Sequence, residues 1–120
     1  MEDSPNIINQ AGNKEALELW RSVTLNNVRV NDFNLSERQM SILLTVYTRD
    51  GKHTVKNLAE ELNITKPPVC RALDSLSKLK LIAREIDKED RRNVFIVPTS
   101  EGYDFLGLLS NNIMDSLAVL

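Results

Sequence analysis

Apolar residues recur at helical spacing through the first part of the chain. The first series predicts a helix over residues 13–30 and consists of Ala16, Leu19, Trp20 and Val23. Ser36 followed by Gln39 forms a capping box, in which each side chain satisfies the backbone N–H of the other residue, so a second helix begins there and ends near residues 49–51. Its apolar positions have the same spacing and are Met40, Leu43, Leu44 and Tyr47.

Two further helices follow, with a tight turn between them. Thr54 caps a short third helix whose apolar positions are Val55, Leu58, Ala59 and Leu62. Asn63 tolerates the left-handed conformation of a tight helix exit. Thr65 then caps a fourth helix that carries Pro67 and Pro68 in its first turn. The buried stripe of this helix is Val69, Ala72, Leu73, Leu76 and Leu79. This order predicts a helix-turn-helix.

Two strand-like runs, residues 82–86 and 94–97, flank a charged hexapeptide over residues 87–92. This pattern predicts an antiparallel β-hairpin with a polar tip. Pro98 closes the second strand because it cannot continue a central strand, and Thr99 or Ser100 caps a final helix. The expected fold is therefore mainly α with a small antiparallel β-hairpin, arranged as a winged helix-turn-helix.

The final helix carries more apolar surface than one buried face needs. Its stripe consists of Leu106, Leu109, Ile113 and Leu117, and further apolar residues lie outside that stripe at Leu108, Met114 and Val119. Such a helix either docks on the core of its own chain or pairs with a second copy. The surplus favours a dimer element.

The composition suits one compact domain. The chain has 120 residues, 42% of them hydrophobic, which is enough for one core and leaves little room for a second. No apolar stretch approaches the roughly 20 residues of a membrane span, and residues 1–5 lack the basic start of a signal peptide, so a cytoplasmic protein without membrane contact is expected. One cysteine and one histidine exclude an internal disulfide framework and argue against a metal, a cofactor and an enzyme.

The net charge of −2 at first argues against a nucleic-acid partner, because phosphate binding draws most of its affinity from Lys and Arg. The distribution of charge changes this picture. Residues 52–92 hold ten basic and seven acidic side chains, a local charge of +3, while the rest of the chain carries −5. Positive charge therefore gathers on the predicted helix-turn-helix and hairpin, although ordinary surface variation also produces biases of this size.

The fourth helix has an outer side that suits DNA. At about 100° per residue, its buried stripe centres on Val69 and Leu76. The flank and opposite side then carry Pro67, Cys70, Arg71, Asp74 and Lys78. That side would face the major groove, where Arg71 forks onto a guanine edge or a phosphate and Lys66 and Lys78 approach the backbone. The alternative is a solvated helix face.

In their order along the chain, these segments resemble the MarR family of bacterial transcriptional regulators. The similar stretches are Leu58–Thr65, Val69–Leu76, Leu81–Arg84 with Asp90–Arg92, and Thr99–Gly102. The resemblance covers about residues 35–105 and implies a homodimer that binds double-stranded DNA at a pseudo-palindromic site. Lys80 departs from the pattern, since the family usually has glycine before the Leu-Ile that opens the wing.

The resemblance also implies roles within the hairpin tip. The wing arginine of the family enters the minor groove and a nearby aspartate braces it, which assigns these roles to Arg92 and Asp90. Arg91 and Lys88 then add phosphate contacts, and the alternative is a merely polar tip. The candidate DNA-binding residues are together Thr65, Lys66, Pro67, Cys70, Arg71, Asp74, Lys78, Lys88, Asp90, Arg91 and Arg92.

The expected organisation is a flexible arm over residues 1–12 followed by a single domain over residues 13–120. Within that domain, residues 35–98 form a DNA-binding lobe, and residues 13–30 and 99–120 form dimerisation helices.

Three questions stay open at the level of sequence. By resemblance alone, a small aromatic or lipophilic effector binds between the dimer helices and the lobe, with Trp20 and Tyr47 as candidate lining residues or as plain core. Cys70 is either a redox switch beside the DNA or a small thiol without a role. The rival function is a winged helix used for protein contact with little or no DNA binding, which the acidic net charge supports.

Overall fold

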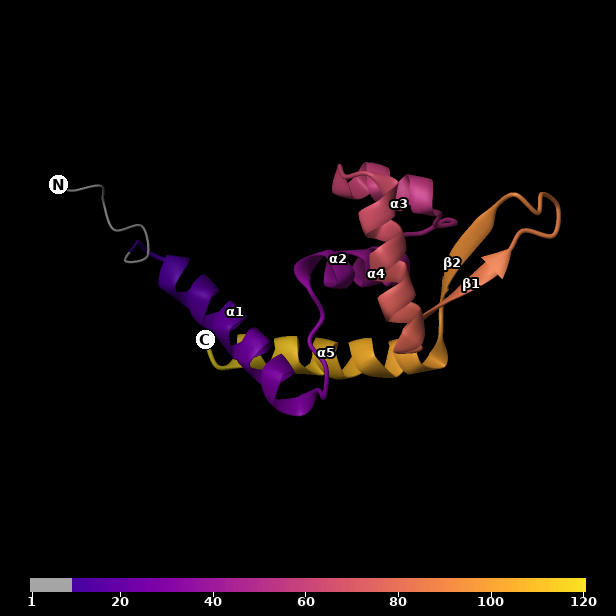
Figure 1. Cartoon of the computed structure of the whole chain (residues 1–120). Coiled ribbons are helices and arrows are strands. Elements are labelled where there is room, and N and C mark those ends of the chain that lie inside the picture. The colour runs from indigo at the N-terminus through magenta and orange to yellow at the C-terminus, as the bar shows by residue number, and fades with distance from the viewer. Residues whose placement is uncertain (1–9) are drawn as a thin grey trace. The chain divides into compact units, whose positions relative to one another are not determined.

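The structure is a computed structural model that describes residues 10–120 (Figure 1). Most of the arm expected over residues 1–12 therefore lies outside the described residues. The elements in chain order are α1 (Asn13–Val30), α2 (Glu37–Thr48), α3 (Val55–Leu62), α4 (Lys66–Lys78), β1 (Ile82–Ile86), β2 (Val94–Pro98) and α5 (Ser100–Ala118). The prediction of a mainly α fold with a small antiparallel hairpin is confirmed.

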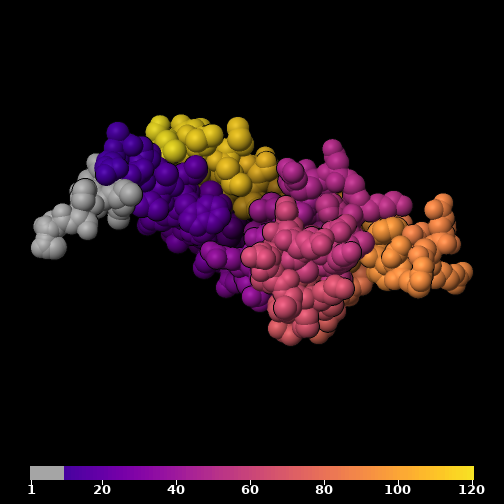
Figure 2. Space-filling model, turned by 90° about the horizontal axis from the view of Figure 1, so that it is seen from above, coloured from indigo at the N-terminus to yellow at the C-terminus, as the bar shows by residue number. Residues whose placement is uncertain are grey.

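The chain divides into two compact units, one comprising the chain up to Asn34 together with Gly107–Leu120, and the other comprising Leu35–Leu106. The second unit holds the helix-turn-helix and the hairpin. Its core is made of side chains from α2, α3, α4 and both strands, and the most deeply buried of them are Ile42, Leu43, Leu58, Val69, Leu73, Leu76 and Ile96. Figure 2 shows the hairpin, in orange, extending beyond the helices of this unit.

The capping box predicted for α2 is present, but the predicted stripe of α2 is partly wrong. Gln39 N–H donates to Ser36 Oγ at 3.1 Å, and Ser36 N–H donates to Gln39 Oε1 at 2.8 Å. The core takes Ile42, Leu43 and Val46, whereas Leu44 remains 39% exposed. The helix packs against α4 and β2, which together cover the side that carries Ile42 and Val46. Two series of apolar residues with the same spacing run along α2. Packing against α4 and β2 determines which of the two series is buried.

Both left-handed turns of the helix-turn-helix lie at residues other than glycine. Asn63 has φ 56° and follows α3, as predicted. Lys80 has φ 62° and follows α4. Each turn closes with the paired backbone bonds of a Schellman motif, which after α4 run from Lys80 N–H to Ser77 O at 2.9 Å and from Leu81 N–H to Leu76 O at 3.0 Å. The hairpin therefore follows a left-handed turn, a backbone conformation that is energetically less favourable for a residue with a Cβ than for glycine.

Replacing Lys80 with glycine is expected to raise the stability of the protein by about 1 kcal/mol, or roughly 4 °C in melting temperature, because glycine adopts a left-handed conformation without the Cβ penalty. Thermal unfolding followed by circular dichroism measures the change. Lys78→Gly, at the last helical residue of α4, is the matched control and should lower stability by up to about 1 kcal/mol. A Lys80→Gly variant that melts below the parent chain would contradict this account.

The start of α5 is tied to α2 and to the end of α4 through two hydroxyl groups. Thr99 Oγ1 accepts the N–H of Gly102 at 2.9 Å, which caps α5 as predicted, and it donates to Lys80 O at 2.7 Å. Tyr47 Oη donates to Leu81 O at 2.5 Å and accepts Thr99 N–H at 3.0 Å. Gly102 is buried beside these hydrogen bonds. The residues that precede β1 are therefore held by hydrogen bonds from α2 and from the start of α5.

The first unit joins α1 to the C-terminal part of α5. Ser22 Oγ and Ser116 Oγ lie 2.8 Å apart, and Asn112 Nδ2 donates to Val23 O at 3.3 Å. Val23 is the buried member of the stripe predicted for α1, whereas Trp20 is 60% exposed. Large apolar side chains stay exposed along both helices at Leu17, Val28, Val30, Leu108, Ile113, Met114 and Leu117. Within residues 10–120, no helix combines the length and the apolar character that a membrane crossing needs.

Candidate nucleic-acid interface

The outer side of α4 is open to solvent, as its spacing predicts. The exposed residues at its start and along its outer side are Thr65, Lys66, Pro67, Arg71, Asp74 and Lys78, and Cys70 is half-buried. Val69, Leu73 and Leu76 fix this orientation because they are fully buried on the inner side. Three cationic side chains of the predicted set therefore lie on one accessible helix.

Thr65 occupies the N-cap position of α4, but its side chain makes no capping hydrogen bond, so the predicted capping role is wrong. An N-cap side chain accepts from the N–H of the second or third helical residue. In α4 these positions are Pro67 and Pro68, which have no N–H. The two prolines preset the helical backbone at the start of α4 without help from the threonine.

Asp74 on α4 forms an ion pair with Arg84 on β1, with Arg84 Nη2 2.8 Å from Asp74 Oδ1. The two side chains are 62% and 36% exposed. Arg84 was not among the residues predicted from sequence. Because β1 pairs with β2 over five residue pairs, this contact ties the whole hairpin to the outer side of α4.

The hairpin tip turns through a set of short backbone bonds. Asp87 N–H donates to Asn93 O at 3.0 Å, and Asn93 N–H donates to Asp90 O at 2.9 Å. The Asp87 carboxylate accepts Glu89 N–H at 2.9 Å. Lys88 and Arg91 are exposed on this turn. The acidic residues of the tip thus shape its backbone, while its basic side chains extend into solvent.

Asp90 and Arg92 form a two-pronged ion pair at the tip. Arg92 Nε donates to Asp90 Oδ1 at 3.0 Å and Arg92 Nη2 donates to Asp90 Oδ2 at 3.0 Å, while the backbone N–H of Arg92 also donates to Oδ1 at 3.1 Å. The hydrogen bonds from the Arg92 side chain and then from its backbone hold the pKa of Asp90 below its ordinary value. The Arg92 side chain is nevertheless 89% exposed, so its guanidinium is oriented without being covered.

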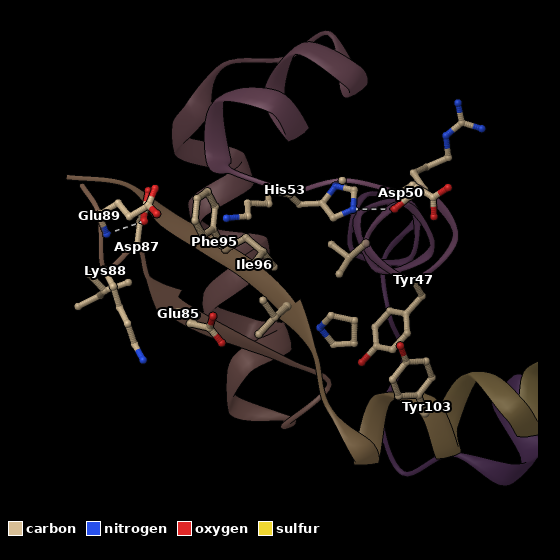
Figure 3. A pocket seen from close by; sticks show the side chains of 17 residues that line it. Tyr47, Asp50, His53, Glu85, Asp87, Lys88, Glu89, Phe95, Ile96 and Tyr103 are labelled. Carbon is tan, nitrogen blue, oxygen red and sulfur yellow. Dashed lines mark hydrogen bonds between the residues drawn. The ribbon is translucent and has the colours of Figure 1, made fainter. Parts of the chain in front are cut away.

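A hollow of about 610 Å³ lies on the other face of the hairpin (Figure 3). Side chains alternate between the two faces of β1, so Arg84 points toward α4 and Glu85 points toward the hollow. Glu85 is paired with Phe95 of β2. Tyr47 and Tyr103 line it as an edge-to-face pair with centroids 5.0 Å apart, and Lys52 Nζ sits 4.5 Å from the centroid of the Phe95 ring. Its volume falls within the roughly 300–1,000 Å³ of small-molecule sites.

The geometry of helix-turn-helix and wing agrees with the comparison to known families. A family model described as the MarR family matches residues 33–93, which is more than half of the chain. The chain belongs to the MarR family. No curated protein sequence matches this MarR-family chain significantly.

Solved structures similar to this MarR-family chain include other regulators. The transcriptional regulator Tm0710 of Thermotoga maritima is 21% identical, with a TM-score of 0.74 over 88% of this chain and 71% of that one. A mutant of S. aureus MepR bound to an oligodeoxyribonucleotide is 26% identical, with a TM-score of 0.72 over 86% and 72%. The MarR-like regulator tm0816 of T. maritima is 27% identical, with a TM-score of 0.64 over 88% and 78%. The fold is that of MarR-family transcriptional regulators.

The structure brings the predicted residues together in two groups. One lies along α4 and the other at the wing tip, which the Asp74–Arg84 pair joins through β1. Arg84 does not stand out in the sequence because its partner Asp74 lies ten residues away in a different element. The alternation of side chains along a strand could have indicated this contact, since it places Arg84 on the same face of β1 as the buried Ile82.

Proposed function

We propose that this MarR-family chain is a sequence-specific, dimeric transcriptional regulator that binds double-stranded DNA. In this proposal α4 enters the major groove and the wing places Arg92 in the minor groove. The observation that carries it is the pre-oriented, exposed guanidinium of Arg92 beside an exposed cationic helix. A narrow minor groove concentrates negative potential and attracts such a group. Regulation by binding requires no catalytic group.

The other predicted residues receive roles from their positions. Lys66 and Lys78 mark the two ends of α4 and are assigned to the DNA backbone. Thr65 has a hydroxyl that caps no helix and is assigned to a phosphate as well. Lys88 and Arg91 at the tip add charge beside Arg92. Asp74 is assigned an indirect role, because its carboxylate pairs with Arg84.

The dimer is proposed to form through residues 13–30 and 99–120, with residues 35–98 as the DNA-binding lobe. The support is the exposed apolar surface of the first unit, in which Trp20, Met114 and Leu117 are each about half exposed or more. Isolated domains rarely expose so many large apolar side chains on adjoining helices. Two copies would place two α4 helices about one DNA turn apart on a pseudo-palindromic site.

Fluorescence anisotropy with duplex fragments of the source genome, titrated at several salt concentrations, tests the proposal. Binding that weakens steeply with salt is expected, and selection of bound sites from random duplexes should return two half-sites with a fixed spacing. A chain that binds no duplex at low salt would favour the rival function, a winged helix used for protein contact. The acidic net charge is the observation that supports that rival.

The hollow between Tyr103 and Phe95 is proposed as the effector site. Its walls combine aromatic rings with the charged groups of Glu85 and Lys52, which suits a small aromatic compound with a polar substituent. A compound bound there would contact the strands of the wing. A thermal-shift screen of small phenolic compounds should yield binders that raise the melting temperature and change DNA affinity, and Tyr103→Ala should abolish both effects. Binders unaffected by that variant would place the effector elsewhere.

A further inference from the structure

We propose that a second, smaller hollow between the start of α2 and the flank of α4 is a binding site for one phosphate group of the DNA backbone, held by Arg38 and Arg71. This inference rests on the proposed DNA-binding function. It gives Arg38 a role, and it decides between the two roles that the sequence leaves open for Arg71. Arg71 becomes a ligand of the backbone and does not read a base.

The hollow has a volume of about 130 Å³. That is well below the roughly 300 Å³ at which sites for organic ligands begin. Ser36, which caps α2, lines it together with Arg38 and Gln39 of that helix, and Arg71 and Ser75 line it from α4, one helical turn apart. The two helices pack against each other (Figure 1). Residues 38 and 71 are thus far apart in sequence and meet around a space that suits a single phosphate.

Four side chains around this hollow carry donors that are available to a ligand, whereas the Ser75 hydroxyl already donates to Arg71 O at 3.3 Å. The capping box uses the acceptor atoms of both Ser36 and Gln39, so the hydroxyl O–H and the amide Nε2 remain for another partner. Within residues 10–120, neither Arg38 nor Arg71 has a side-chain hydrogen bond or ion pair. Two unpaired guanidinium groups and two further donors match the oxygens of a phosphate diester.

Among the described residues, no carboxylate lines the hollow. The nearest acidic residue on the outer side of α4 is Asp74, and its carboxylate is already paired with Arg84 at 2.8 Å. Glu37 precedes Arg38 in sequence but does not contribute to the lining. Local charge therefore favours an anion, although the chain as a whole is negative.

A contact to phosphate and a contact to a base respond differently to mutation. Loss of a phosphate ligand weakens binding to all sequences alike and lowers the slope of log affinity against log salt by about 1 per subunit. Loss of a base contact relaxes the selected sequence at one position. The variants Arg38→Gln and Arg71→Gln separate these cases. Arg49→Gln removes the same charge at the other end of α2 and is the matched control.

We expect Arg38→Gln and Arg71→Gln each to reduce DNA affinity roughly tenfold. Each variant should lower the salt slope and leave the selected sequence unchanged, while Arg49→Gln changes affinity less than twofold. Titration of the parent chain with inorganic phosphate should shift the backbone amide signals of residues 36–39, and Arg38→Gln should remove that shift. A relaxed base preference in Arg71→Gln, or unchanged affinity in Arg38→Gln, would overturn the inference.

The measurement of DNA affinity and the titration with phosphate together separate this inference from the proposed function. If Arg38→Gln loses the phosphate-induced shifts but keeps full DNA affinity, the hollow binds free phosphate and the assignment to DNA is wrong. If the parent chain binds no DNA at all, the proposed function fails, and so does the assignment of the hollow to a DNA phosphate. If Arg92→Ala weakens DNA binding while Arg38→Gln does not, the proposed function stands and this inference falls.

Discussion

Replacing Gly102 with alanine is expected to destabilise the protein by about 3 kcal/mol or more, which lowers the melting temperature by roughly 10 °C or more. A Cβ at this position would collide with the Tyr47 hydroxyl and lie 2.5 Å from the backbone carbonyl oxygen of Leu81. The Tyr47 hydroxyl cannot withdraw without breaking its bonds to Leu81 and Thr99. Thermal unfolding measures the effect.

Gly107→Ala is the matched control for this experiment. Gly107 lies on the same helix, and a Cβ there would meet no atom within 4 Å. Alanine in the interior of a helix is favoured over glycine by about 0.5–1 kcal/mol, so this variant should melt at or above the parent temperature. A Gly102→Ala variant that melts like the parent chain would contradict the close packing of α5 against Tyr47.

Replacing Arg92 with alanine is expected to reduce DNA affinity by roughly 10- to 100-fold for each wing that contacts the DNA, since a hydrogen bond to a charged group contributes about 1.5–3 kcal/mol. The fold should be unaffected, because the side chain is 89% exposed and its observed partner is Asp90 at the same tip. Anisotropy titration measures affinity, and a thermal melt on the same sample verifies folding.

Asp90→Asn provides a graded comparison. It keeps the charge of Arg92 but weakens the fork that orients the guanidinium, so the loss of affinity should be smaller than in Arg92→Ala. Arg91→Ala removes a neighbouring charge that has no such fork and should reduce affinity less than Arg92→Ala does. Equal effects of Arg91→Ala and Arg92→Ala would mean that the tip contributes only its net charge.

Much of the fold could be predicted because its signals are local. The capping box at Ser36 and Gln39, the left-handed turn at Asn63 and the cap at Thr99 each involve residues within a few positions of one another. Lys80 is the informative case. It occupies a position where glycine is usual in the family, and the backbone adopts the left-handed conformation without glycine. The fold thus imposes its turn on a residue that disfavours it.

The features of the fold that could not be predicted depend mostly on contacts between elements that are distant in sequence. Spacing alone did not distinguish the stripe with Leu44 from the stripe with Ile42 and Val46, because both are apolar at the same period. The cap at Thr65 failed for a reason already visible in the sequence, namely that Pro67 and Pro68 lack the N–H groups that a cap needs. On α1, the spacing of Trp20 predicts burial, yet its side chain is 60% exposed in the single chain.

The roles of individual site residues were harder to predict than their exposure. Spacing correctly turned Arg71 and Asp74 outward. It gave no indication that Asp74 pairs with Arg84, or that Arg38 shares a hollow with Arg71. These pairs join α4 to β1 and α2 to α4, and their partners are set by tertiary packing.

The ion pair at the wing tip also bears on how the protein would search a genome. A chromosome offers roughly 10⁶–10⁹ competing sites, and a free arginine would adhere to phosphates at all of them. The Arg92 guanidinium already shares two N–H groups with Asp90, so a single phosphate must compete with a carboxylate in place. We expect this competition to shorten the time spent on incorrect sequences, while a groove lined by several converging acceptors still retains the wing.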